Sequence, residues 1–185
     1  MRVIGGELRS RRLKALHGLA LRPTPDRLRE ALFNVLAPRL EGRTFVDAYA
    51  GCGAVGIEAL SRGAARAIFI EKHRQAARVI EENLEALGVK ARAVVLCAPA
   101  LKHLGRVGAD IVFLDPPYEL ESEYRQALRL LGAKPPGLVI VQHSARLRLE
   151  EASGGLLQTR VLKQGDNVLS FFEPPTACTR SGSLE

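Results

Sequence analysis

Short apolar runs alternate with amphipathic stretches along most of this chain. The apolar runs have the length of buried strands, and they occur at residues 44–48, 67–70, 91–96, 110–114 and 137–142. The stretches between them repeat apolar residues every three or four positions, which predicts helices from a glycine loop to about residue 62, at 73–87 and at 121–131. This order of elements predicts an α/β fold with a mostly parallel sheet and helices on both faces.

One more helix is expected before the first strand. Apolar residues between Leu28 and Leu36 recur at helical spacing and form a single stripe. Thr24 is expected to cap this helix, and Pro25 to occupy its first position, where a missing N–H costs nothing. The helix is expected to end near Pro38.

The remaining pattern sets the expected domain organisation. Residues 156–163 and 167–172 read as a closing antiparallel hairpin. The length of 185 residues suits one compact domain with a small appendage. We therefore expect a basic N-terminal arm or hairpin at 1–22, one domain at 23–173 and a loose tail at 174–185, whose last five residues resemble a cloning remnant.

Positive charge is concentrated at the start of the chain. The net charge is +7, and residues 1–43 hold ten Lys and Arg against four Asp and Glu, which favours a polyanionic partner met by an N-terminal element. We find neither the roughly 18 consecutive apolar residues of a membrane span nor the apolar segment of a secretory signal. Three separated cysteines and four scattered histidines match no disulfide or metal pattern, so a cytoplasmic protein without a metal is expected.

A glycine loop after the first strand predicts a cofactor site. Residues 51–56 fit G-x-G-x-x-G, and Glu71 follows Gly51 by 20 residues, at the end of the next strand. An acid at that place can accept hydrogen bonds from two ribose hydroxyls, in NAD as well as in other adenosine cofactors. Asp47 ends the first strand, where a carboxylate would repel a pyrophosphate but could orient a cationic ligand such as S-adenosylmethionine. Capping of loop amides is the alternative role for Asp47.

A rigid turn follows the fourth strand, at the sheet edge where α/β folds bind ligands. Its residues are Asp115, Pro116, Pro117 and Tyr118. Two prolines remove two N–H donors, so the turn offers carbonyl acceptors and one carboxylate, which suit an amino group. Tyr118 offers a flat face on which a base can stack. The alternative is a structural turn with a partly buried tyrosine.

These four residues resemble the [DN]PP[YF] signature of methyltransferases that act on exocyclic amines of bases. Residues 1–173 resemble the RsmD-type 16S rRNA (guanine-N2)-methyltransferases through MRVIGGELRSRRL, RPTPDRLREALFNVL, FVDAYAGCGAVGIEALSRGA, FIEKH, IVFLDPPY and GDNVLSFFE. The resemblance implies a Rossmann-like methyltransferase fold with a seven-stranded, mostly parallel sheet and one reversed strand. It also implies methyl transfer from S-adenosyl-L-methionine to the N2 amine of a guanine in 16S rRNA.

The resemblance assigns roles to individual residues. Those expected to contact the methionine part of the cofactor are Asp47, Ala50, Gly51 and Gly53. Glu71 is expected to hold the ribose, and Asp115–Tyr118 the target base, with Asp115 also beside the cofactor. The family often places Asp or Asn after the third strand to bind adenine, whereas this chain reads Leu-Cys-Ala-Pro at 96–99, which leaves backbone groups, apolar packing or Cys97.

The expected RNA contacts are phosphate contacts of basic side chains. They are Arg2, Arg9, Arg11, Arg12, Lys14, Arg22 and Arg27, and Arg29 is expected to continue this charge on the helix. The resemblance favours a partly assembled small subunit as substrate, and a monomer is the default. Three alternatives stay open: a DNA or RNA adenine-N6 or cytosine-N4 methyltransferase, an NAD-dependent oxidoreductase, and a catalytically silent RNA-binding protein. The oxidoreductase leaves the Asp-Pro-Pro-Tyr turn and the basic arm unexplained.

Overall fold

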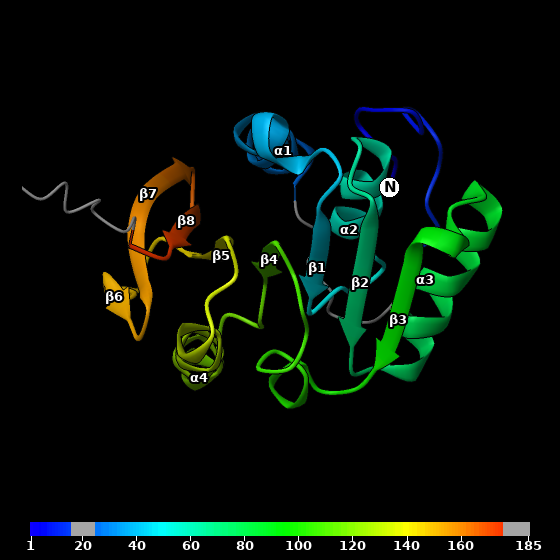
Figure 1. The fold of residues 1–185 in the computed structure, drawn as a ribbon. Coiled ribbons are helices and arrows are strands. Elements are labelled where there is room, and N and C mark those ends of the chain that lie inside the picture. Colours follow the sequence, from blue (N-terminus) through cyan, green and yellow to red (C-terminus); the bar gives the residue numbers. More distant parts are fainter. Residues whose placement is uncertain (16–24, 176–185) are drawn as a thin grey trace, which may run out of the picture.

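The computed structural model describes residues 1–15 and 25–175. An eight-stranded sheet with the order β3-β2-β1-β4-β5-β8-β7-β6 forms its centre (Figure 1). The strands are β1 (Thr44–Ala48), β2 (Arg66–Glu71), β3 (Ala93–Cys97), β4 (Ile111–Leu114), β5 (Leu138–Ser144), β6 (Ala152–Ser153), β7 (Leu156–Gln164) and β8 (Asn167–Glu173). The helices are α1 (Asp26–Leu40), α2 (Ala54–Ser61), α3 (Arg74–Leu87) and α4 (Glu121–Ala133), with 3-10 turns η1 (Lys90–Arg92) and η2 (Ala100–Lys102).

The predicted fold class is confirmed, with a correction to the strand count. Strands β1 to β5 are parallel, and β8 enters the sheet antiparallel to β5. The sheet has eight strands instead of seven, because β6 adds two residues antiparallel to β7 and is thus a second reversed strand. Two residues carry no readable period, so the sequence pattern could not reveal β6.

Helices cover both faces of the sheet. Helices α1, α2 and α3 pack on one face, whereas α4 and η2 pack on the other. Neighbouring residues of a strand point to opposite faces, so Phe45 joins the cluster under α1 while Val46 joins the cluster under α4. Both faces of the central strands are therefore apolar, as is expected for a parallel sheet.

Helix α1 differs from its prediction at both ends. Pro25 is the residue before the helix instead of its first residue, and Pro38 lies inside the last turn instead of ending it. Burial of Leu36 and Leu40 in the core holds this last turn although the proline donates no hydrogen bond. The predicted cap, Thr24, lies outside the described residues.

The described part of the N-terminal arm, residues 1–15, is a compact loop on the surface of α2 and α3. One antiparallel bridge joins Arg2 and Arg12, so the expected hairpin is reduced to a single pair. Val3, Leu8 and Leu13 are buried in the same cluster as residues of both helices, which ties the loop to the body of the protein. Among the described helices, none combines the length and apolarity needed to cross a bilayer.

Candidate functional site

The glycine loop leaves β1 through a series of left-handed residues. Positive φ angles occur at Tyr49, Gly51 and Gly53, and α2 begins directly after Gly53. A Cβ built on Gly51 would meet nothing within 4 Å, so the loop exposes its backbone to open space there. A Cβ on Gly56 would instead lie 2.3 Å from the Phe69 ring, because α2 packs closely on β2. Gly51 thus leaves the backbone of the loop uncovered, and Gly56 allows the close contact between helix and sheet.

Two buried carboxylates hold this loop. Asp47 accepts a hydrogen bond from the Gly56 amide at 2.7 Å, which is the capping role considered above. Glu71 accepts from the amides of Gly51 and His73, each at 2.8 Å. A carboxylate has about four acceptor positions, so these bonds leave both side chains capacity for a ligand.

Negative charge accumulates at this end of the sheet. Burial, followed by the charges of Asp115 and Glu71, raises the pKa of Asp47 from 3.8 to about 8, against the lowering effect of the Gly56 amide. The carboxylates of Asp115 and Glu71 thus act on Asp47 at one edge of the sheet, which suits a ligand that carries positive charge. In residues 1–15 and 25–175 we find no group of three His, Cys, Asp or Glu placed to hold a metal ion.

The Asp-Pro-Pro-Tyr turn is held at both ends. Asp115 directly follows β4, which lies between β1 and β5 in the sheet. The buried Tyr124 hydroxyl donates to the Pro116 carbonyl oxygen at 2.8 Å, which fixes the turn and takes one lone pair of that oxygen. The Tyr118 hydroxyl donates to Asn167 Oδ1, at the start of β8, at 2.9 Å. The tyrosine ring is thus anchored toward β8, while Asp115 lies near enough to Asp47 to raise its pKa.

A further contact joins the two halves of the site. The Tyr49 hydroxyl, in the loop after β1, donates to Glu123 Oε2 in the first turn of α4 at 2.5 Å. Burial and this hydrogen bond raise the pKa of Tyr49 above its usual range. Tyr124 and Tyr49 were not predicted as functional residues, since their partners lie in segments that the sequence does not relate.

Cys97 lies at the end of β3 and is exposed, opposite Glu71 in the sheet register. The Ala98 amide beside it donates to the Glu71 carbonyl oxygen at 3.0 Å, and Pro99 has no N–H. The backbone donors at this corner are therefore engaged or missing, and a role of Cys97 toward adenine stays a prediction.

The predicted RNA contacts are distributed over the arm and α1. Arg2, Arg9, Arg12 and Arg27 are exposed. The Arg11 guanidinium donates to the Ala86 carbonyl oxygen, and Lys14 forms an ion pair with Glu82, so these two also hold the arm on α3. Arg22 lies outside the described residues.

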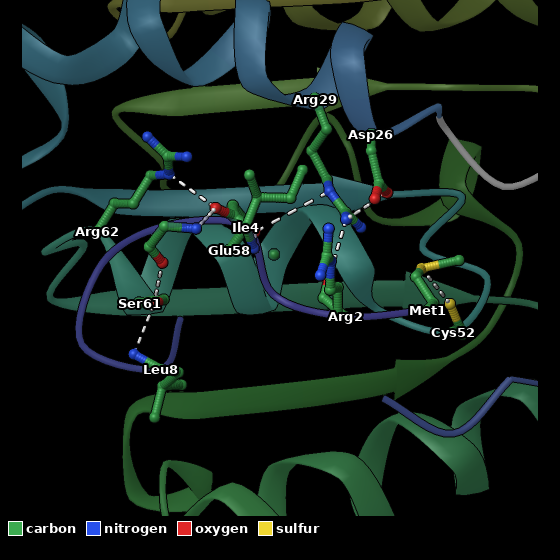
Figure 2. A network of polar contacts seen from close by, with 12 residues as sticks. Met1, Arg2, Ile4, Leu8, Asp26, Arg29, Cys52, Glu58, Ser61 and Arg62 are labelled. Atoms are coloured by element: carbon green, nitrogen blue, oxygen red, sulfur yellow. Dashed lines mark hydrogen bonds and ion pairs between the residues drawn. The ribbon is translucent and has the colours of Figure 1, made fainter. Parts of the chain in front are cut away.

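A buried polar network fastens the arm to α1 and α2 (Figure 2). Glu58 of α2 accepts from the amides of Ile4 and Gly5 at 2.8 and 2.7 Å and from Arg62 Nε at 2.8 Å. Arg29 of α1 is fully buried, lies 4.0 Å from Glu58 and donates to the Arg2 carbonyl oxygen at 2.7 Å. The expected RNA contact of Arg29 is wrong, because its side chain is buried in this network. The network itself was not predicted from the sequence. Its signal is a charged residue inside the otherwise apolar stretch of α2.

Known proteins resemble this chain in sequence over most of its length. A family model described as "Conserved hypothetical protein 95" matches residues 1–173. The Ribosomal RNA small subunit methyltransferase D of Escherichia coli (strain K12) is 43% identical over 120 residues, which cover 64% of this chain and 60% of that protein. The protein of the same name from Haemophilus influenzae is 36% identical over 151 residues, covering 77% of this chain and 78% of that protein.

Solved structures show the same architecture. The Escherichia coli protein yhhF superposes with a TM-score of 0.84 at 31% identity, over 94% of this chain and 97% of that chain. An RNA methyltransferase from Salinibacter ruber in complex with S-adenosyl-L-homocysteine superposes with a TM-score of 0.65 over 88% of this chain and all of that chain. The second pair shares 15% identity, so it supports the fold alone.

Proposed function

Because this chain belongs to the family described as Conserved hypothetical protein 95, the RsmD family, we propose that it is an S-adenosylmethionine-dependent methyltransferase of 16S rRNA. The proposed acceptor is the exocyclic N2 amine of a guanine. The observation that carries this proposal is the position of Asp115, which lies close enough to Asp47 for its charge to act there and begins a turn whose tyrosine is anchored.

The cofactor side of the site suits S-adenosylmethionine. Asp47, Ala50, Gly51 and Gly53 would hold its methionine part, with open space above Gly51, and Glu71 would hold the ribose. Cys97 would lie near the adenine. The cofactor carries a sulfonium and an ammonium and no phosphate, so it would relieve the repulsion among the carboxylates that a pyrophosphate would increase.

When bound, the cofactor supplies a methyl group on a positively charged sulfur. Asp115 would accept one N–H of the target amine, and the Pro116 carbonyl oxygen, held by Tyr124, would accept the other through its second lone pair. These two bonds orient the nitrogen lone pair and stabilise the positive charge that develops on nitrogen. Pro117 stiffens the turn, and Tyr118 would stack on the base after it leaves its helix. The methylated nitrogen then loses its extra proton, for which Asp115 is the nearest acceptor in this scheme.

We also propose where and on which form of the RNA the enzyme acts. Basic residues of the arm and α1 would contact rRNA phosphates, within a cytoplasmic small-subunit assembly intermediate and with the enzyme acting as a monomer. An NAD-dependent oxidoreductase is set aside, because the named relatives are rRNA methyltransferases. Methylation of another exocyclic amine is the remaining alternative, and product analysis distinguishes it.

The proposal is tested by methyl transfer from tritiated S-adenosylmethionine into small-subunit particles that lack the modification. Digestion to nucleosides should place the label in N2-methylguanosine of 16S rRNA. Asp115→Ala should lower turnover at least about a hundredfold while calorimetry still shows cofactor binding, because the carboxylate acts on the amine.

Glu119→Gln is the matched control, since it removes an exposed carboxylate four residues further along the same turn. It should leave turnover near that of the unmodified enzyme. Label in adenosine or cytidine would instead support the alternative acceptor, and near-normal turnover of Asp115→Ala would refute the role of the carboxylate.

A further inference from the structure

Asn83 is a polar residue on the apolar face of α3. It falls in line with Ala76, Ile80 and Leu87 at spacings of four, three and four residues, and its side chain is 2% exposed. An amide in such a place is costly unless its donors and acceptor find partners. The partners of Asn83 lie outside the helix, in two segments far apart in sequence.

The side-chain amide joins the arm to the glycine loop. Asn83 Oδ1 accepts from the Lys14 amide at 2.8 Å, and Nδ2 donates to the Lys14 carbonyl oxygen at 3.0 Å. The same nitrogen donates to the Cys52 carbonyl oxygen at 3.3 Å, in the centre of the glycine loop. One buried side chain therefore satisfies three backbone groups, two in the arm and one in the loop.

Other contacts tie the same two segments together. The Cys52 thiol points to the Met1 sulfur at 3.7 Å, as Figure 2 shows at the start of the chain. Val3, Leu8 and Leu13 of the arm share one apolar cluster with Ala50 and Ala54, which flank the loop. The arm thus packs against the glycine loop at both of its described ends.

We propose that Asn83 is a positioning residue that holds the glycine loop in its cofactor-binding shape by tying it to the N-terminal arm. The inference rests on the proposed cofactor site and deepens it. Coupling between two sites is reciprocal. A cofactor that binds this loop shape more tightly must therefore stabilise the bound position of the arm by the same coupling free energy. Binding of the cofactor at the loop and binding of RNA at the arm would then influence each other's affinity.

The first test uses the unmodified protein with S-adenosylhomocysteine and no RNA. Hydrogen exchange at the Lys14 amide, the donor to Asn83, should slow when the ligand binds, by more than exchange at amides of β7 on the far side of the sheet. Equal slowing everywhere would indicate general stabilisation by the ligand, and an unchanged Lys14 amide would show that the arm does not sense the cofactor. Either result overturns the inference.

The second test compares variants by calorimetry with the same ligand. Asn83→Leu keeps the size of the side chain and removes all three hydrogen bonds, so the affinity should fall about fivefold or more, and the ligand effect on the Lys14 amide should disappear. Glu82→Gln is the matched control, because it removes the neighbouring exposed ion pair with Lys14 and leaves the Asn83 bonds in place. A folded Asn83→Leu protein with unchanged affinity sinks the inference, whereas an unmodified protein that binds no ligand sinks the proposed cofactor site itself.

Discussion

Asp47 shows how a single buried residue sets the charge of the site. Its carboxyl is 2% exposed and receives one amide hydrogen bond, while two further carboxyl groups lie nearby. Burial is the largest cause of its raised pKa, and neighbouring negative charge adds to it. The cofactor-free protein therefore holds a proton at Asp47 in neutral solution, and a cationic ligand must displace that proton to gain the full ionic interaction.

The affinity for S-adenosylmethionine should consequently depend on pH. Below the pKa of about 8, each unit of rising pH makes the ionised carboxylate more abundant, so the affinity should rise by up to about tenfold per unit and level off near pH 8. Calorimetry at a series of pH values on both sides of this pKa measures the slope. S-Adenosylhomocysteine, which lacks the sulfonium charge, should show a smaller slope. The Asp47→Asn variant should bind S-adenosylmethionine weakly, and its affinity should not depend on pH in this range. Equal slopes for both ligands would contradict the role of Asp47 toward the sulfonium.

The same pKa has a consequence for folding. Between pH 3.8 and about 8 the folded protein keeps a proton at Asp47 that the unfolded chain has lost. The contribution of this residue to the free energy of unfolding is therefore largest in acid and falls as pH rises through that range. Burial of Asp47 therefore lowers the free energy of unfolding at neutral pH, and strongly shifted pKa values of this kind are common at functional sites.

Glu58 acts at the scale of the elements, because it connects the arm to α2 and α1. Glu58→Ala should lower the free energy of unfolding by about 3–5 kcal/mol, since it leaves two arm amides without an acceptor and leaves the buried Arg29 with the exposed Asp26 as its ion-pair partner. Thermal denaturation should show a melting temperature lower by about 6–20 °C. Glu85→Gln on α3, which breaks an exposed ion pair with Lys90 of η1, serves as the control and should melt close to the unmodified protein. A similar melting temperature for Glu58→Ala would mean that the arm is not held through this carboxylate.

The elements themselves were largely predictable from the sequence. The five parallel strands and α2, α3 and α4 begin and end within about three residues of their predicted positions, because buried runs and helical stripes leave a strong period. The arm was harder to predict, since Arg2 and Arg12 form a single bridge and the loop is held by side chains of other elements. Such support depends on contacts between distant segments, which no local pattern carries.

The placement of three candidate site residues follows from the same strand pattern, while their roles stay predictions. Asp47, Glu71 and Asp115 each end or follow an apolar run, so the sheet geometry brings them to one edge. The residues that hold these groups could not be predicted, because Tyr124 reads as an inward helix residue and Asn167 as part of a hairpin. A polar residue inside an apolar stripe, as at Asn83, is the signal that the sequence does carry.

At the scale of the whole molecule, the site follows the order of the strands along one edge of the sheet. Cys97 ends β3, Glu71 ends β2, Asp47 lies near the end of β1 and Asp115 follows β4, which gives the proposed order of adenine, ribose, methionine and target base. The hydrogen bond from Tyr118 to Asn167 extends this row of site residues to β8, the strand next to β5. Cofactor and base would thus meet near the centre of the sheet.

The arm lies across α2 with its ends at the site and its turn at the opposite end of the helix. Met1 and Lys14 are tied to the glycine loop, whereas Glu7 and Leu8 donate their amides to Ser61, the last residue of α2. The exposed charged residues near the two ends of the arm therefore lie on the side of the proposed base-binding turn. Those near Glu7 and Leu8 lie at the other end of α2. Deletion of the arm is a poor test of RNA binding, because it would uncover buried apolar residues of the core.

Substitution of Arg2 and Arg12 together by Gln should weaken RNA binding and flatten its salt dependence. Both side chains are exposed on the bridge between the two halves of the arm. Each lost phosphate contact should reduce the slope of log K against log salt by about 0.7–0.9, so the double variant should reduce it by up to about 1.4–1.8. Binding to 16S rRNA measured at several salt concentrations gives this slope. Substitution of Arg125 and Arg129 together by Gln, two exposed arginines of α4 on the other face of the sheet, removes two positive charges elsewhere and should leave the slope unchanged. If the arm and α4 variants weaken RNA binding by the same small factor at every salt concentration, the arm affects binding only through the net charge of the protein. The phosphate contacts then lie on another surface.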